Sequence, residues 1–211
     1  MKNNFKNPNI MKNIILLLFS LFLIIGCNRD NDDSSDGFVA VLPPETQTGA
    51  NTFGCTVNGR LFYPRDGIPN VGSNPKGVEF SALGNYPDYI YNELTVNNYK
   101  DGKPVNFSTM HFVNLKQIGE YSWKQTNFKT GIDGVNENYF LVRAFDYSEN
   151  VWKWYGSYDN SGKIIISKYS NGIFSGTFSG KLRTEDGKSE IEINDGRFDF
   201  NLFTLPTQTF P

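Results

Sequence analysis

The side chains that could carry out chemistry in this chain are few, beginning with a single histidine and two cysteines. His111 lies in an alternating apolar stretch, and Cys55 lies at strand spacing between Phe53 and Val57. Zinc sites need three or four Cys, His or carboxylate ligands, so we expect no metal, and nothing in the chain indicates a cofactor. A Ser-His-Asp triad would have to use His111, and no G-x-S-x-G elbow accompanies it. We expect His111 to be a hydrogen-bonded strand residue and Cys55 a small buried apolar side chain.

Paired carboxylates could hydrolyse a glycoside, and three acids are candidates for this chemistry: Asp88, Glu93 and Asp146. The mechanism needs two carboxyl groups roughly 5 to 9 Å apart, and the sequence does not place any two of them together. Five other acids lie in the predicted Asp-Gly turns, where backbone geometry explains them. We therefore expect a protein that is not an enzyme, with a carboxylate-based hydrolase as the alternative.

An aromatic cluster from Val151 to Tyr158 is the most suggestive candidate for binding. In a strand, Trp152 and Trp154 share one face. Exposed, they would form a platform on which a sugar ring or another aromatic ring could stack, with Tyr155 beside them. Buried, they would be core or rim packing, because aromatic residues favour strands and bury large areas. We name Trp152, Trp154 and Tyr155 as candidate ligand-binding residues and keep both interpretations.

The N-terminus has the pattern of a secretory signal peptide, residues 1–26. Three lysines precede an apolar run from Ile14 to Ile25 that only Ser20 interrupts. This run is too short to span a bilayer stably, which takes about 18 apolar residues, and its length and positive flank are typical of a signal peptide. Either Met1 or Met11 could start translation, since the segment from Met11 already forms a complete signal.

The residues Ile24-Ile25-Gly26-Cys27 resemble the lipobox of bacterial lipoproteins. The resemblance implies cleavage before Cys27, acylation of its sulfur and of the new N-terminus, and anchoring in the outer membrane, because several acyl chains hold a protein at a bilayer. Residues 27–44 begin with acids, Ser and Asn that cannot bury apolar surface, which predicts a disordered tether. The acidic stretch after Cys27 is similar to the surface-export signal of lipoproteins from Bacteroidetes-type bacteria. The alternative is a plain linker facing the periplasm.

The charge balance excludes one class of partner. Residues 1–26 contain three of the 20 basic residues and none of the 22 acidic ones, so the remainder has 17 basic and 22 acidic residues and a net charge of -5. No basic patch or aromatic-basic repeat is present, so we expect no nucleic-acid partner.

The remaining chain has the period of β-strands. Apolar residues alternate with polar ones in 89–96, 139–147, 163–170, 173–182, 190–194 and 197–202. Asn-Gly and Asp-Gly pairs separate these segments and suit type I′ hairpin turns; they begin at Asn58, Asp66, Asp101, Asp133, Asn171, Asp186 and Asp195. Alternation with one polar face is typical of antiparallel sheets. The sequence predicts an all-β domain over residues 45–203, either a β-sandwich or a small β-barrel, followed by an unstructured tail, residues 204–211.

Both ends of this domain are similar to an uncharacterised domain family of Bacteroidetes lipoproteins. The first similar segment is Thr46-Gln47-Thr48-Gly49-Ala50-Asn51-Thr52-Phe53-Gly54-Cys55 with Val57-Asn58-Gly59, and the second is Ser175-Gly176-Thr177-Phe178-Ser179-Gly180 with Asp195-Gly196-Arg197-Phe198-Asp199. The resemblance implies a shared β-fold and a lipid anchor, and it transfers no activity. We expect a cell-envelope lipoprotein that acts by binding a glycan or an envelope protein; a structural subunit of an outer-membrane assembly is a further alternative.

Overall fold

The computed structural model describes residues 39–211 except 86–87, 101 and 116. The predicted signal peptide, the lipidated Cys27 and residues 28–38 of the tether lie outside the described residues. Within the described part, no helix is long and apolar enough to cross a membrane.

The described chain folds into strands joined by loops, with two short 3-10 helices, η2 (Gly131–Asp133) and η3 (Leu205–Thr207). The strands are β1 (Thr52–Val57), β2 (Arg60–Phe62), β3 (Val78–Asn85), β4 (Asp88–Asn97), β5 (Val105–Val113), β6 (Gly119–Ser122), β7 (Tyr139–Asp146), β8 (Val151–Gly156), β9 (Gly162–Ser170), β10 (Ile173–Arg183) and β11 (Glu190–Asn201). The all-β prediction is confirmed.

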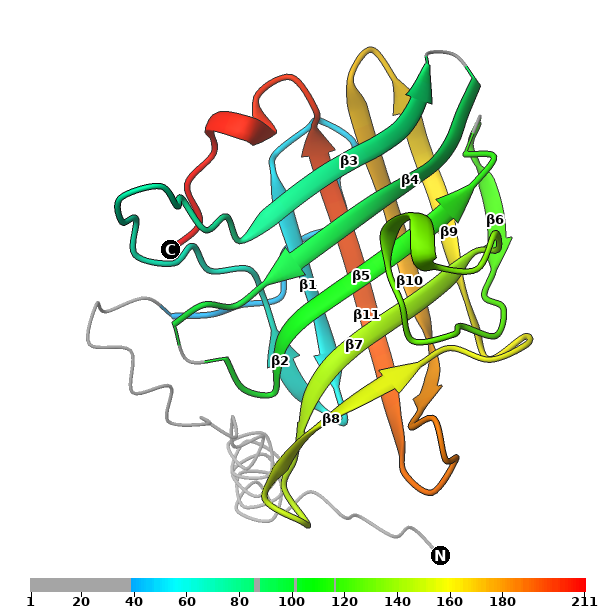
Figure 1. Cartoon of the computed structure of the whole chain (residues 1–211). Coiled ribbons are helices and arrows are strands. Elements are labelled where there is room, and N and C mark those ends of the chain that lie inside the picture. The colour runs from blue at the N-terminus through cyan, green and yellow to red at the C-terminus, as the bar shows by residue number, and fades with distance from the viewer. Residues whose placement is uncertain (1–38, 86–87, 101, 116) are drawn as a thin grey trace, which may run out of the picture. The chain divides into compact units, whose positions relative to one another are not determined.

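The strands form one curled antiparallel sheet whose two arms face each other as layers (Figure 1). The order is β2-β1-β11-β10-β8-β7-β5-β4-β3, with β9 and β6 continuing from β10. In Figure 1 the front layer holds β3, β4, β5, β7 and β8, and the steeper strands β1, β11, β10 and β9 lie behind it. A single pair, Arg183 with Gly156, joins β10 to β8. The sheet therefore bends at β10, and its end strands β2 and β3 do not pair.

Two of the predicted hairpin turns have the expected backbone. Asn58 and Gly59 have φ angles of 49° and 78° between β1 and β2, and Asn171 and Gly172 have 53° and 75° between β9 and β10. Positive φ at both central residues is what a type I′ turn requires. These turns set the register of the two hairpins.

The pair Asp195-Gly196 is not a turn, which corrects the prediction. It lies inside β11, where Asp195 has a φ of 54° and the pairing with β10 shifts register. The extra residue makes a β-bulge, which moves the inward side chains from odd to even positions. Ile191 and Ile193 are buried before it, and Phe198 and Phe200 are buried after it. Asp133-Gly134 is also not a hairpin, because Asp133 ends η2.

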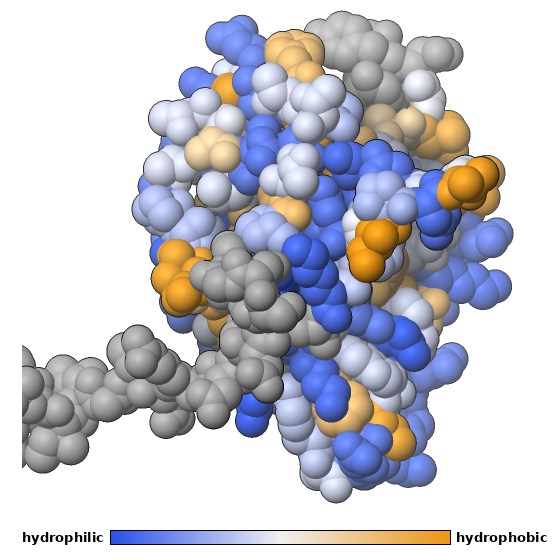
Figure 2. All heavy atoms as spheres, turned by 90° about the vertical axis from the view of Figure 1, so that its left-hand side faces the viewer, coloured by the Kyte–Doolittle hydropathy of each residue, from blue (hydrophilic) through white to orange (hydrophobic). Residues whose placement is uncertain are grey.

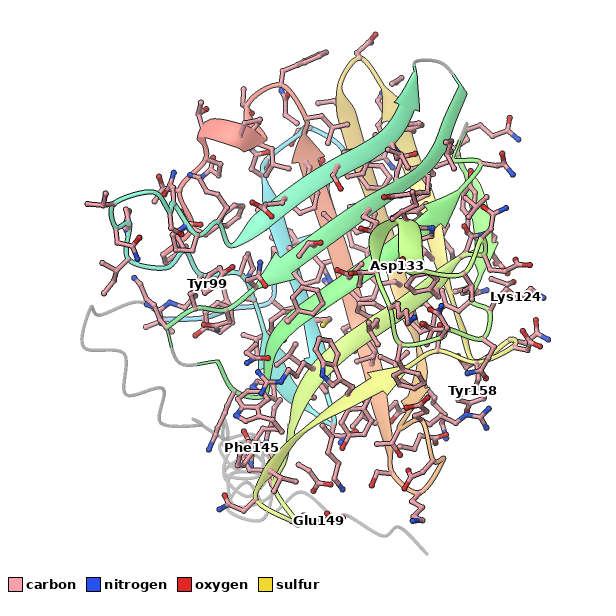
Figure 3. The ribbon with its side chains drawn as sticks, in the orientation of Figure 1. Tyr99, Lys124, Asp133, Phe145, Glu149 and Tyr158 are labelled. Carbon is pink, nitrogen blue, oxygen red and sulfur yellow. The ribbon has the colours of Figure 1, made fainter. Side chains whose placement is uncertain are left out.

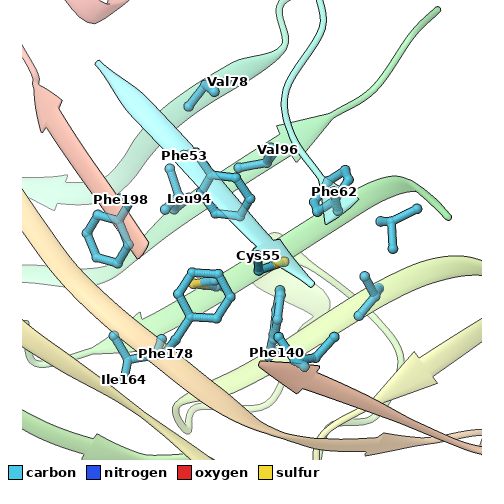
Figure 4. Packing of buried hydrophobic residues seen from close by; sticks show 14 of the residues in the cluster. Phe53, Cys55, Phe62, Val78, Leu94, Val96, Phe140, Ile164, Phe178 and Phe198 are labelled. Atoms are coloured by element: carbon cyan, nitrogen blue, oxygen red, sulfur yellow. The ribbon is translucent and has the colours of Figure 1, made fainter. Parts of the chain in front are cut away.

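The core lies between the two layers and is rich in aromatic rings (Figure 4). Phe53 from β1 stacks on Phe178 from β10 at 5.5 Å and meets Phe62 edge to face at 5.7 Å. Cys55 is 1% exposed in this cluster, as predicted. Burial raises the pKa of its thiol well above the ordinary value, so the thiol is not reactive in the folded protein.

Glycines on β9 and β10 make room for the third tryptophan, Trp123, which is fully buried. A Cβ on Gly162 would lie 2.3 Å from the Trp123 ring, and one on Gly180 would lie 2.4 Å from the Cα of Gly162. Gly180, the last residue of the Ser175–Gly180 motif, therefore allows β10 to pack closely against β9 and Trp123.

The carboxylate of Asp199 connects both ends of the domain through a group of hydrogen bonds that we call the Asp199 clasp. Asp199 is 1% exposed, and it accepts hydrogen bonds from Thr46 Oγ1, Thr48 N and Oγ1, Gly49 N, Ala50 N and Ser175 Oγ. Burial alone would raise the pKa of Asp199, but the hydrogen bonds from Ser175, Thr46 and the backbone amides hold it well below the ordinary value.

The domain extends beyond the predicted limits at both ends. Residues 204–211 are not an unstructured tail: Leu205 and Phe210 are 4% and 6% exposed and belong to the core. Buried Arg65 donates from Nε to the backbone oxygen of Pro211 at 3.0 Å. At the other end, Pro43 lies against Gly54 and accepts a hydrogen bond from Arg197, so the last residues of the predicted tether pack on the domain.

Candidate functional site

Strand β8 places two tryptophans on the outer face of the front layer. Trp152 and Trp154 alternate with Lys153 and Tyr155 along this strand. Trp154 is 44% exposed and Trp152 is half-buried, and neither belongs to the hydrophobic core. As predicted, the two tryptophans share a face. They are not core residues, whereas the half-buried position of Trp152 against Phe145 also fits the rim packing of the alternative interpretation.

Tyr155 points the other way, which removes it from the candidate site. Its side chain is 2% exposed and packs within the core between the layers. Burial raises the pKa of its phenol. A strand alternates its faces, so Tyr155 cannot join Trp152 and Trp154 on one surface.

The two tryptophans line an open pocket of about 490 Å³, which we call the tryptophan groove. The β4–β5 loop forms one wall, and β5, β7 and β8 provide the rest. The described lining residues are Asn97, Asn98, Tyr99, Lys100, Gly102, Asn106, Phe107, Arg143, Trp152 and Trp154. Figure 3 labels Tyr99 on this loop and Phe145, whose ring meets Trp152 edge to face at 5.3 Å.

Contacts between neighbouring strands hold the tryptophan rings in place. Phe107 meets Trp154 edge to face at 5.5 Å, and the Arg143 guanidinium lies 5.4 Å from the Trp152 ring. The loop wall is shaped by Asn98, whose Oδ1 accepts hydrogen bonds from the backbone N–H groups of Lys100 and Gly102. The rings and the wall are therefore positioned by this chain before any ligand arrives.

The groove offers aromatic surface and hydrogen-bonding groups side by side. The flat face of an indole can stack on the apolar face of a ring, while amides and a guanidinium fix its polar edge. Asn106 also lines the groove, but its side-chain oxygen has almost no accessible surface and no hydrogen-bond partner in the described structure, so it is not a contact point for a ligand.

The exposed apolar residues elsewhere do not suggest another site. Figure 2 shows one face of the molecule, where hydrophilic residues predominate and apolar ones form small separate groups. Single exposed apolar residues are normal for soluble domains.

The single histidine belongs to a different cluster, on strands β4, β5 and β7. His111 Nδ1 lies 2.9 Å from Glu93 Oε1, and the N–H of Gly131 donates to the same oxygen at 2.7 Å. The rings of Tyr91 and Tyr139 each lie 4.6 Å from the imidazole. His111 is 2% exposed, so it is the hydrogen-bonded strand residue that the sequence predicts, and the cluster fixes the loop that carries η2.

Two of the acids proposed for hydrolysis, Glu93 and Asp146, do not form a pair. Glu93 lies opposite His111, and His111 lies opposite Tyr139 at the start of β7. Asp146 is seven residues further along β7, or roughly 23 Å at the usual strand rise, whereas a hydrolytic pair needs roughly 5 to 9 Å. Asp146 is instead held by Lys153 and Ser148, whose hydrogen bonds keep its pKa well below the ordinary value. The side chain of Asp88 lies outside the described residues.

Sequence reasoning missed Arg143, Phe107 and the asparagines of the groove. The only available signal was the short β7–β8 hairpin, in which Arg143 pairs directly with Trp154. Phe107 comes from β5, and its place beside Trp154 depends on a register that the sequence does not display. The described residues contain no group of three or more His, Cys, Asp or Glu side chains that could hold a metal ion.

Comparison of the chain with protein-family models, curated proteins and solved structures gives no match.

Proposed function

We propose that this chain is a lipid-anchored lipoprotein of the bacterial outer membrane that binds glycans through the tryptophan groove without catalysing a reaction. The anchor rests on the lipobox resemblance at Cys27. The binding role rests on one observation: two tryptophans lie outside the core and line an open groove of about 490 Å³.

The combination of groups in the groove favours a sugar over a purely apolar ligand. A sugar ring has an apolar face and a polar edge, and the groove pairs indole rings with amides and charged groups. The groove is also open, so that one segment of a longer glycan chain can lie in it. The acidic stretch after Cys27, which is similar to the surface-export signal of lipoproteins from Bacteroidetes-type bacteria, adds the expectation of a surface location.

A glycan-array screen of the full chain, purified in mild detergent, tests this function. Any hit is then titrated by tryptophan fluorescence, which should change because Trp154 is accessible, whereas Trp123 is fully buried. Trp154→Ala should abolish the fluorescence change and the binding while the fold is retained. Phe203→Ala, which removes an exposed aromatic ring outside the groove, is the matched control and should bind normally.

The results separate the proposed function from the alternative partner. Binding that survives Trp154→Ala would move the site away from the groove. A screen without any hit would overturn glycan binding and direct attention to an envelope protein, which crosslinking on whole cells would then identify.

A further inference from the structure

Two positively charged side chains, Lys100 and Arg143, are among the described lining residues of the tryptophan groove. The chain beyond residue 26 has a net charge of -5. A positively charged side chain in a groove attracts anions even when the whole protein is acidic.

Arg143 is half-buried and has no carboxylate partner within the described part of the chain. Its guanidinium lies 5.4 Å from the Trp152 ring, and it takes part in none of the ion pairs between described residues. An arginine presents several N–H donors in a planar fork that matches a carboxylate or sulfate. The cation–π contact with Trp152 restrains this fork and leaves N–H groups for another partner.

Further cations lie beside the groove on a row of aromatic rings. Lys103 Nζ lies 3.6 Å from the centre of the Phe145 ring, and Phe145 in turn packs against Trp152. The Arg60 guanidinium lies 4.2 Å from the Tyr147 ring, which meets Phe145 at 5.1 Å. Aromatic and cationic groups therefore continue from the groove along the end of β7, a surface that suits a ligand with rings and negative charges along its length.

We propose that the groove binds an acidic saccharide, one that carries a carboxylate or a sulfate group. Arg143 pairs with the anionic group, Trp154 stacks on the sugar ring, and the neighbouring Lys103 contributes to binding of a longer chain. This inference rests on the proposed glycan-binding function and adds to it the chemical class of the ligand.

The test uses two matched pairs of saccharides, each with a charged and a neutral member. The first is a hexamer of galacturonic acid and its methyl ester, and the second is a heparin-derived hexasaccharide and its desulfated, N-acetylated and carboxyl-reduced form. Affinities are measured by tryptophan fluorescence on the full chain in mild detergent. In at least one pair, the charged member should bind ten times more tightly or better, because hydrogen bonds to charged groups are strong. Added salt should reduce this preference.

Arg143→Gln should bring the charged and neutral members of a pair to similar affinity. The matched control is Arg183→Gln, because Arg183 also stacks on an aromatic ring, at 4.3 Å from Tyr158, but does not line the groove. The control should keep the full preference. Circular dichroism of both variants checks that the fold is intact.

The outcomes distinguish the two levels of the proposal. Equal binding of charged and neutral members would overturn the acidic ligand and leave glycan binding in place. A preference that survives Arg143→Gln would overturn the role of Arg143. If neither pair binds while neutral glycans bind in the array, the proposal of an acidic ligand is overturned and glycan binding stands. If nothing binds in either experiment, glycan binding itself is overturned.

Discussion

Thr46 Oγ1 donates a hydrogen bond of 2.6 Å to Asp199 Oδ2, across 153 positions of the chain. Ser175 reaches the other oxygen of the same carboxylate, also at 2.6 Å. These residues belong to the two sequence segments on which the expected family resemblance rests. In the structure those segments form the Asp199 clasp, and the residues of the tryptophan groove lie outside them.

Asp199→Asn should destabilise the domain by about 3 kcal/mol at pH 7, because a buried carboxylate that accepts many hydrogen bonds is replaced by an amide. The pKa of Asp199 is lowered in the folded state, so the unfolded state binds the proton first as pH falls below about 5. The stabilising contribution is thus present near neutral pH and is lost on acidification. Urea unfolding at pH 7 and pH 3.5 measures this effect. The difference in free energy of unfolding between the variant and the wild type should be smaller at pH 3.5 than at pH 7.

Asp186→Asn is the control for this measurement. Hydrogen bonds from Thr184 and Lys188 lower the pKa of Asp186 to about 2, but its side chain is exposed. Its removal should change stability little at either pH. A difference between Asp199→Asn and the wild type that is the same at both pH values would contradict the proposed protonation effect.

Gly180→Ala should destabilise the domain more than Gly119→Ala, although both residues have a φ of 155°. The new Cβ at position 180 would lie 2.4 Å from the Cα of Gly162 and 2.6 Å from Trp123, whereas nothing lies within 4 Å at position 119. The backbone penalty is shared, so the difference measures overpacking, about 1 to 3 kcal/mol. Thermal and urea unfolding of both variants provide the comparison, and equal effects would show that close packing at position 180 does not matter.

Phe210→Ala should reduce the free energy of unfolding by about 3 kcal/mol, because its ring is 6% exposed and belongs to the core. Phe203→Ala makes the same chemical change at a ring that is 77% exposed, and it should cost under about 1 kcal/mol. Equilibrium unfolding in urea measures both. Equal, small effects would mean that residues 204–211 contribute nothing to the core.

Cys27→Ala should move the protein from the membrane fraction to the soluble fraction of cells, because the variant has no sulfur to acylate. Cys55→Ala is the matched control, since Cys55 is buried in the core of the domain; it should leave the distribution unchanged. Immunoblots of fractionated cells measure the result. Membrane retention of Cys27→Ala would refute the lipobox interpretation.

The strands could be predicted because alternation is a local pattern. The segment 173–182 indicates β10, and Asn171-Gly172 indicates its turn, from adjacent residues alone. The bulge at Asp195-Gly196 could not be distinguished from a turn, because the same dipeptide supplies a positive φ to both. The packing of Phe210 depends on partners far along the chain, which no local pattern reveals.

The candidate site was predictable only along one strand. Alternation places Trp152 and Trp154 on one face, and the same rule should have placed Tyr155 on the other. Alternation does not tell whether that face points into the core or to solvent. In the structure, Phe107 and Arg143 on the neighbouring strands β5 and β7 lie beside Trp154 and leave part of its ring exposed. The pairing register that brings these residues together cannot be read from the sequence.

The Asp199 clasp also has a mechanical consequence. A force that pulls on the N-terminal side of the domain arrives at residues 46–50 before it reaches β1. There, hydrogen bonds from Thr46, Thr48, Gly49 and Ala50 to one buried carboxylate share the load. Because several bonds must break together for the chain to peel away, the domain is reinforced at the point where a tethered protein would feel tension from a ligand held at a distance.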